Sequence, residues 1–90
     1  MSTTRYAVTF TRAAERALRK TDRPVQRRLL DSIEDLRDDP RPPGARTLQG
    51  GQGLLRVRVG DFRVVYRVHD DELVVLVVTL GHRREVYRGI

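Results

Sequence analysis

The segment from Leu54 to Val68, LLRVRVGDFRVVYRV, constrains the fold more than any other part of the chain. Its apolar and polar residues alternate on both sides of Gly60-Asp61, and a period of two is typical of β-strands. A two-residue loop that begins with glycine favours a type II′ turn, so we predict a β-hairpin. Its register places three apolar pairs on one face: Val59 with Phe62, Val57 with Val64, and Leu55 with Tyr66.

The other face of the predicted hairpin is basic. Arg58 lies opposite Arg63, and Arg56 lies opposite Val65. Like charges placed directly opposite each other destabilise a hairpin, so such a cluster needs a reason. The planar fork of arginine matches the oxygens of phosphate. We therefore predict that this face binds an anion.

The residues before the hairpin predict one strand and two helices. Residues 5–10 contain Tyr, Val, Thr and Phe and indicate a first strand. Thr11 is a suitable N-cap for a helix that runs through Leu18. Asp22 and Pro24 begin a second, amphipathic helix that extends to about Arg37, and the proline-rich residues 40–44 end it in a loop.

The residues after the hairpin predict the rest of the sheet. Leu73 to Leu80 is apolar on both faces and indicates an interior strand, Gly81 ends it, and residues 85–88 add a short last strand. We expect an α+β fold, a single domain over residues 1–90, with the order β-α-α-β-β-β-β. Two N-terminal helices pack on one face of a twisted, mainly antiparallel sheet. They leave open the other face, which carries Arg56, Arg58 and Arg63. The expected core comprises Val25, Leu29, Ile33, Leu36, Val57, Val64, Tyr66, Val75 and Val77.

The composition of the chain limits the kinds of partner, compartment and metal site that we expect. The net charge of +6 favours an acidic partner, either a nucleic acid or an acidic protein, although basic surfaces also serve solubility. The absence of cysteine excludes disulfides and thiolate metal sites and fits a reducing compartment. No apolar run is long enough for a transmembrane helix, and the first residues lack the apolar core of a signal peptide. We expect a cytoplasmic protein that does not associate with a membrane and that uses no metal ion and no small-molecule cofactor.

A second basic cluster, GHRREVYR, follows the interior strand and contains Arg83, Arg84 and Tyr87. Taken alone, this cluster also has ordinary structural interpretations. Arg83 and Arg84 would be a solvated charged end, and Tyr87 would be a strand residue that packs on the core. His82 has no second His or Cys nearby and is a poor metal ligand, so we expect a solvated loop residue. Phosphate-binding glycine loops, serine nucleophile elbows and HExxH motifs are absent from the sequence.

The whole chain resembles the RelE/ParE superfamily of bacterial type II toxins. The resemblance lies in Leu48-Gln49-Gly50, in the run LRVRVGDFRVVYRV and in the C-terminal HRREVY. RelE-type members cleave mRNA in the ribosomal A site, whereas ParE-type members poison DNA gyrase. The C-terminal Arg followed by Tyr is similar to the RelE side. The resemblance thus implies a metal-independent mRNA interferase with two partners, a cognate antitoxin protein and mRNA on the ribosome.

The resemblance also implies roles for individual residues. Arg56, Arg58 and Arg63 would bind the scissile phosphate, Arg83 would neutralise or protonate the leaving oxygen, and Tyr87 would orient or activate the attacking 2′-OH. RelE-type sites often carry Lys where this chain has Arg56 and Arg58. Because Arg stays charged in proteins, this site stabilises negative charge well but is poor in general bases. The carboxylates of Asp61 and Glu85 are near these arginines in the sequence, but the sequence does not predict where they lie in the fold.

Two other function classes remain open at this point. A ParE-like gyrase poison would bind its target without cleaving RNA. A non-catalytic module would use the arginine face only for an antitoxin or for operator DNA.

Overall fold

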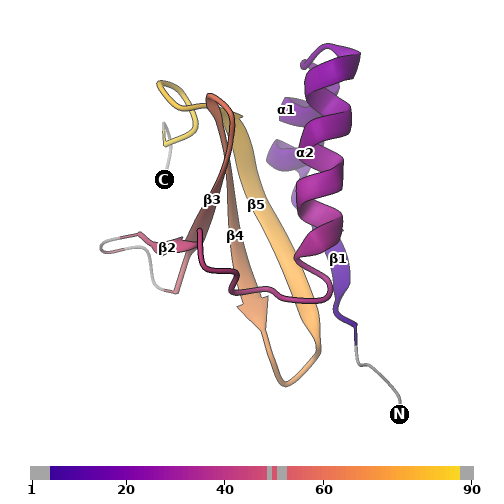
Figure 1. Ribbon diagram of the computed structural model, residues 1–90, viewed down its shortest axis with the longest axis vertical. Helices are drawn as coiled ribbons and strands as arrows, with labels where there is room; N and C mark the ends of the chain where they lie inside the picture. The colour runs from indigo at the N-terminus through magenta and orange to yellow at the C-terminus, as the bar shows by residue number, and fades with distance from the viewer. Residues whose placement is uncertain (1–4, 49, 51–52, 88–90) are drawn as a thin grey trace.

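The predicted hairpin forms the centre of the sheet. The computed structural model describes residues 5–48, 50 and 53–87. Its elements are β1 (Ala7–Phe10), α1 (Arg12–Arg19), α2 (Arg23–Asp35), β2 (Arg46–Thr47), β3 (Leu55–Val59), β4 (Phe62–His69) and β5 (Val74–His82). The five-stranded sheet has the order β1-β5-β4-β3-β2; β1 pairs with β5 in parallel, and the other pairs are antiparallel (Figure 1).

The register of the hairpin is confirmed in all five predicted pairs, from Leu55 with Tyr66 to Val59 with Phe62. Gly60 has a φ of 61°, which the first loop residue of a type II′ turn requires. A Cβ at this position would lie 2.7 Å from Arg28 Nη2, the end of a flexible side chain that can move, so the positive φ is what favours glycine here. The alternating pattern therefore fixes which residues face the helices.

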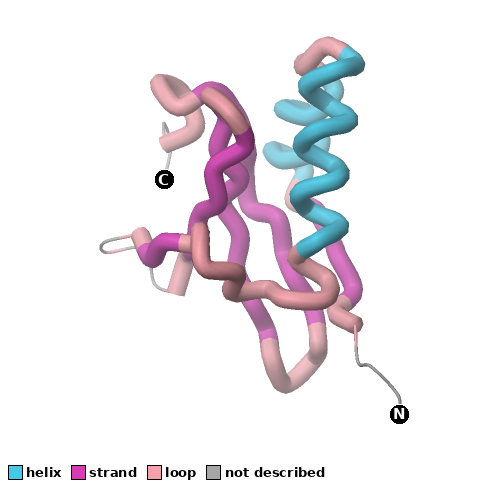
Figure 2. Tube along the Cα trace, viewed as in Figure 1, coloured by secondary structure: helices cyan, strands magenta, loops and turns pink. Residues whose placement is uncertain are grey.

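Both helices begin at the predicted caps. The Thr11 hydroxyl accepts a hydrogen bond from the Ala14 amide at 3.1 Å, and the Asp22 carboxylate accepts one from the Val25 amide at 3.2 Å. The helices lie together on one side of the sheet (Figure 2), so the α+β fold and its layers are confirmed. None of the helices in the described residues is long and apolar enough to cross a membrane.

The main core lies between the helices and the sheet. The predicted core residues are all present, although Val25 is only partly buried at the margin. Tyr66 is fully buried, and its hydroxyl donates to the Pro40 carbonyl at 2.7 Å. Burial raises the pKa of this phenol to about 12. The bond ties the proline-rich loop to the middle of the sheet.

The end of the sheet differs from the prediction. Gly81 does not end β5, because it pairs with Arg63 and the strand continues to His82. Residues 83–87 form turns rather than a last strand, held by hydrogen bonds from the Glu85 and Val86 amides to the His82 carbonyl. Arg88, the last residue of that expected strand, lies outside the described residues. The remaining strand is instead β2, which precedes the hairpin.

The face opposite the helices is less open than predicted. Val65 is fully buried there, in a small apolar cluster with Leu54 and Val86. The C-terminal turn lies on the side of the sheet away from the helices (Figure 1), and its Val86 packs on Val65 of this face. Burial of Val86 explains why the turn replaces a strand, since an edge strand would leave fewer apolar contacts to this side chain.

A polar cluster joins the β4–β5 turn to the proline-rich loop. The Arg41 guanidinium donates to both carboxylate oxygens of Asp70, at 3.1 and 2.8 Å, and the Tyr6 hydroxyl donates to the same carboxylate at 2.7 Å. Hydrogen bonds from Arg41 and then from Tyr6 lower the pKa of Asp70 to about 2. The ionised form of Asp70 is therefore the form that stabilises the fold.

This cluster predicts a specific acid sensitivity. A carboxylate whose pKa is lower in the folded than in the unfolded state stabilises the fold above its ordinary pKa of 3.8, and this contribution is lost as the pH falls toward about 2. Asp70→Asn should make the loss of stability over this interval less steep. Urea unfolding from pH 5 to pH 2 measures the effect, with Asp71→Asn as the control because no ion pair involves Asp71 among the described residues. Equal slopes for the two variants would contradict the prediction.

Candidate anion-binding face

The side chains opposite the helices form rows across the strands. The row nearest the hairpin turn joins Arg58 on β3, Arg63 on β4 and Gly81 on β5. The Arg63 guanidinium donates to the carbonyls of Phe62 and Gly60, at 3.1 and 3.4 Å. These bonds use one nitrogen and leave the rest of the guanidinium for a ligand. Arg58 lies at the edge of the sheet, where it also borders a hollow against α2.

The next row places Arg56 between Arg46 of β2 and Val65 of β4. Arg46 is a residue that the sequence analysis missed. Nothing local in the sequence indicates a two-residue strand, so its position opposite Arg56 emerges only from the folded sheet. Two arginines therefore lie directly opposite each other here as well, which repeats the arrangement of Arg58 and Arg63.

The third row contains Arg67, which pairs with Leu76 of β5. Arg67 was also missed, although the alternation that places Arg63 and Val65 on this face places Arg67 there too. We name the five residues Arg46, Arg56, Arg58, Arg63 and Arg67 the arginine face. Rows on one face of a strand are about 6.5 Å apart, so the arginine face follows the strands over three rows, which are two steps.

The arginine face carries uncompensated positive charge. The ion pairs between described residues involve Arg5, Arg37 and Arg41 and none of its five members. Arg56 Nη1 and Arg67 Nε are buried and have no hydrogen-bond partner. A buried donor without a partner costs free energy, and a charged donor costs more. An anion bound at this surface could supply the missing partners.

The C-terminal turn approaches the arginine face at two points. The Arg83 amide donates to the Asp61 carbonyl at 2.8 Å, which places Arg83 at the hairpin end, beside the row of Arg58 and Arg63. Tyr87 follows Val86, which packs on Val65 in the middle row. The Tyr87 side chain is 39% exposed and is not the packed strand residue that its type alone favours. The structure thus places Arg56, Arg58 and Arg63 on one face, and Arg83 and Tyr87 in the turn beside it. No hydrogen bond among the described residues joins Tyr87 to an arginine of this face.

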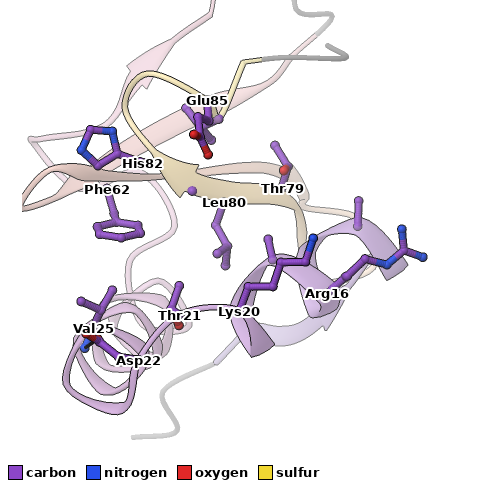
Figure 3. Close-up of a pocket in the computed structure, with 14 residues that line it drawn as sticks. Arg16, Lys20, Thr21, Asp22, Val25, Phe62, Thr79, Leu80, His82 and Glu85 are labelled. Carbon is purple, nitrogen blue, oxygen red and sulfur yellow. Dashed lines mark hydrogen bonds between the residues drawn. The ribbon is translucent and has the colours of Figure 1, made fainter.

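Two candidate general bases lie elsewhere. His82 ends β5 opposite Phe62 and is not the loop residue we expected; the two rings meet edge-on with centroids 5.8 Å apart. Because Phe62 packs on the helix side of the sheet, His82 also faces that side. Glu85 borders a hollow of about 520 Å³ between the helices and the end of β5, together with Arg16 and Lys20 (Figure 3). Asp61, the other carboxylate near these residues in the sequence, is exposed in the hairpin turn beside Arg58 and Arg63. The arginine face is therefore rich in cations, with one carboxylate residue in the turn at its hairpin end.

Among the residues that the structure describes, no three His, Cys, Asp or Glu side chains gather in a way that could hold a metal ion. The side chains that the sheet brings together on the arginine face are guanidinium groups. Such groups can bind a phosphate and stabilise charge that develops on it.

The family model for the ParE toxin of the type II toxin–antitoxin system parDE matches residues 8–87. The chain belongs to the RelE/ParE superfamily of type II toxins.

Similar proteins lie on the RelE side of this superfamily. A RelE-like toxin protein of Escherichia coli is 32% identical over 81 residues, which cover 88% of this chain and 84% of the relative. Toxin RelG of Mycobacterium tuberculosis is 29% identical over 84 residues, 92% of this chain and 97% of the relative. In the crystal structure of the RelBE2 toxin–antitoxin complex of M. tuberculosis, a chain of 27% identity superposes with a TM-score of 0.77, covering 88% of this chain and 99% of that chain.

Proposed function

We propose that this toxin is an mRNA endonuclease that cleaves in the A site of the ribosome and acts in the cytoplasm. The observation that carries the proposal is the arginine face, whose charges have no carboxylate partner among the described residues. Tyr87 lies in the turn whose Val86 packs on its middle row. RelE-like relatives over nearly the whole chain support this choice of target.

The proposed reaction is an intramolecular displacement at phosphorus. The 2′-oxygen of the substrate ribose attacks the adjacent phosphorus and loses its proton, the bond to the 5′-oxygen breaks, and the leaving oxygen takes up a proton. The products are a 2′,3′-cyclic phosphate and a 5′-hydroxyl. Arg56, Arg58 and Arg63 would stabilise the charge on the pentavalent phosphorus, Arg83 would neutralise the leaving oxygen, and Tyr87 would orient the 2′-OH.

The shortage of bases on the arginine face explains why such an enzyme would depend on the ribosome. His82 and Glu85 face elsewhere, so the proton of the 2′-OH would pass through Tyr87, water or Asp61 of the hairpin turn. Holding the mRNA in an attacking geometry can lower the barrier by ~7–11 kcal/mol without any base. The ribosome would supply that positioning.

A cognate antitoxin is the second partner that we propose. Solved structures similar to this chain include the RelBE2 complex and an archaeal RelE–RelB complex from Pyrococcus horikoshii, which has 28% identity and a TM-score of 0.76. In this chain β2 pairs only with residues 55 and 56 of β3, and β1 pairs only up to Val77 of β5. β3 and β5 therefore continue past the short strands that pair with them, and each leaves an open edge. An open strand edge is a template for an added strand.

Mapping mRNA ends by primer extension after induced expression tests the endonuclease proposal. We expect new 5′ ends within translated codons, and we expect them to disappear when the start codon of the reporter mRNA is removed. A matched strain expressing Arg63→Ala provides the control for cleavage by host nucleases. Intact mRNA during toxic expression would contradict the proposal.

A gyrase poison is the second candidate, because the matching family model is that of ParE toxins. It predicts the opposite pattern: replication stops, mRNA stays intact, and purified gyrase is inhibited in a supercoiling assay. Measuring both outcomes in one induced culture separates the two candidates.

A further inference from the structure

We propose that Arg67 and Arg46, on either side of Arg56, form a second phosphate subsite that holds single-stranded RNA next to the phosphate that is cleaved. The inference rests on the proposed function and extends it by two residues for which that function gives no role. Both belong to the arginine face, and neither pairs with a carboxylate among the described residues.

The register brings these two side chains close to Arg56. Arg46 is the direct cross-strand partner of Arg56, and such partners have Cβ atoms about 5 Å apart. Arg67 is two residues beyond Val65, the other partner of Arg56, so it is a diagonal neighbour at about 7–8 Å. Three arginines on adjacent strands therefore share one patch, in which Arg46 and Arg56 are one row and Arg67 two rows from Arg58 and Arg63.

Burial indicates that this patch is built to receive a ligand. The stem of Arg67 lies in a row with Leu76 of β5, beside the apolar cluster around Val65, and its Nε is buried without a partner. Arg56 Nη1 is also buried and has no hydrogen-bond partner. An arginine stem that packs on apolar neighbours holds its charged end in place, so less side-chain entropy is lost when an anion binds.

The spacing of the rows favours a chain of phosphates over a single anion. Cationic rows that recur about every 6.5 Å along the strands suit a polyanion whose charges also recur along a chain. An acidic segment of the antitoxin could meet the same charges, but the adjacent row of Arg58 and Arg63 is where the proposed function places the RNA phosphate that is cleaved. We therefore assign the subsite to RNA and treat the antitoxin as an outcome of the test.

The test measures how salt weakens binding of a 2′-O-methyl RNA oligonucleotide, a probe that cannot be cleaved by 2′-OH attack. Each lost phosphate contact should reduce the slope of log K against log salt by about 0.7. Arg67→Gln and Arg46→Gln should each show this reduction, together with about a three- to tenfold loss of affinity at low salt. Arg67→Lys, which keeps the charge, should retain the slope of the original protein.

Arg27→Gln is the matched control, because Arg27 is an exposed arginine of α2 on the helix side of the molecule. It changes the net charge by the same amount and should leave the slope unaltered. A thermal unfolding curve for each variant shows whether the loss of binding accompanies a loss of folding. Reduced slopes in well-folded Gln variants support a contact with phosphate and exclude a purely structural role.

Three results would overturn the inference: no oligonucleotide binding by the original protein, an unchanged slope in Arg67→Gln, or a slope that falls equally in Arg27→Gln. Loss of antitoxin binding in Arg67→Gln with unchanged RNA binding would assign the patch to the antitoxin. Failure of the proposed function has a different signature: mRNA stays intact in cells although the oligonucleotide binds with an Arg67-dependent slope.

Discussion

Arg63→Ala should lower mRNA cleavage by ~10²–10³-fold, the usual effect of removing one well-placed group that stabilises transition-state charge. Arg63 lies in the row nearest the hairpin turn, opposite Arg58 and beside the end that Arg83 approaches. Its own hydrogen bonds are two contacts to carbonyls of the hairpin turn. The expected result is loss of toxicity on induction.

The stability of Arg63→Ala should stay close to that of the original protein. The substitution removes two hydrogen bonds at the surface, and it also removes the repulsion between Arg63 and Arg58. Thermal unfolding measures this, and Arg19→Ala on α1 provides a control for the loss of one surface charge. If Arg63→Ala unfolds and toxicity falls in parallel with stability, Arg63 is a structural residue and the arginine face is not the site.

Tyr87→Phe should lower cleavage by about 10²-fold or more, because only the hydroxyl that would orient or activate the 2′-OH is removed. The ring of Tyr87 is half exposed, and its hydroxyl makes no hydrogen bond within the described residues, so folding should not change. Single-round cleavage of mRNA on programmed ribosomes measures the rate. Antitoxin binding should persist and shows that the variant is intact.

Tyr6→Phe is the matched control for Tyr87→Phe. It also removes one phenolic hydroxyl, but that hydroxyl donates to Asp70 at the far end of the sheet, so stability should change and cleavage should not. The chemistry of the product ends gives a second check on the mechanism. Ends with a 5′-phosphate and a 3′-hydroxyl would contradict attack by the 2′-OH even if mRNA is cut.

The sequence alone determined the hairpin, the two helices and the sharing of the sheet between an apolar and a basic face. These features depend on local physics: a period of two fixes the faces of β3 and β4, a glycine permits the turn at Gly60, and side chains of Thr11 and Asp22 cap the helices. The same alternation placed Arg56, Arg58 and Arg63 together. The same alternation along β4 also places Arg67 on this face.

Only the tertiary structure decided the ends of the sheet and the full extent of the arginine face. β5 passes through Gly81 because β4 supplies hydrogen bonds that outweigh the weak strand preference of glycine. The C-terminal residues turn because burial of Val86 on Val65 favours a turn over an edge strand. Arg46 reaches Arg56 because a long loop returns to the edge of β3. Each outcome depends on contacts between residues distant in sequence, and no local pattern encodes them.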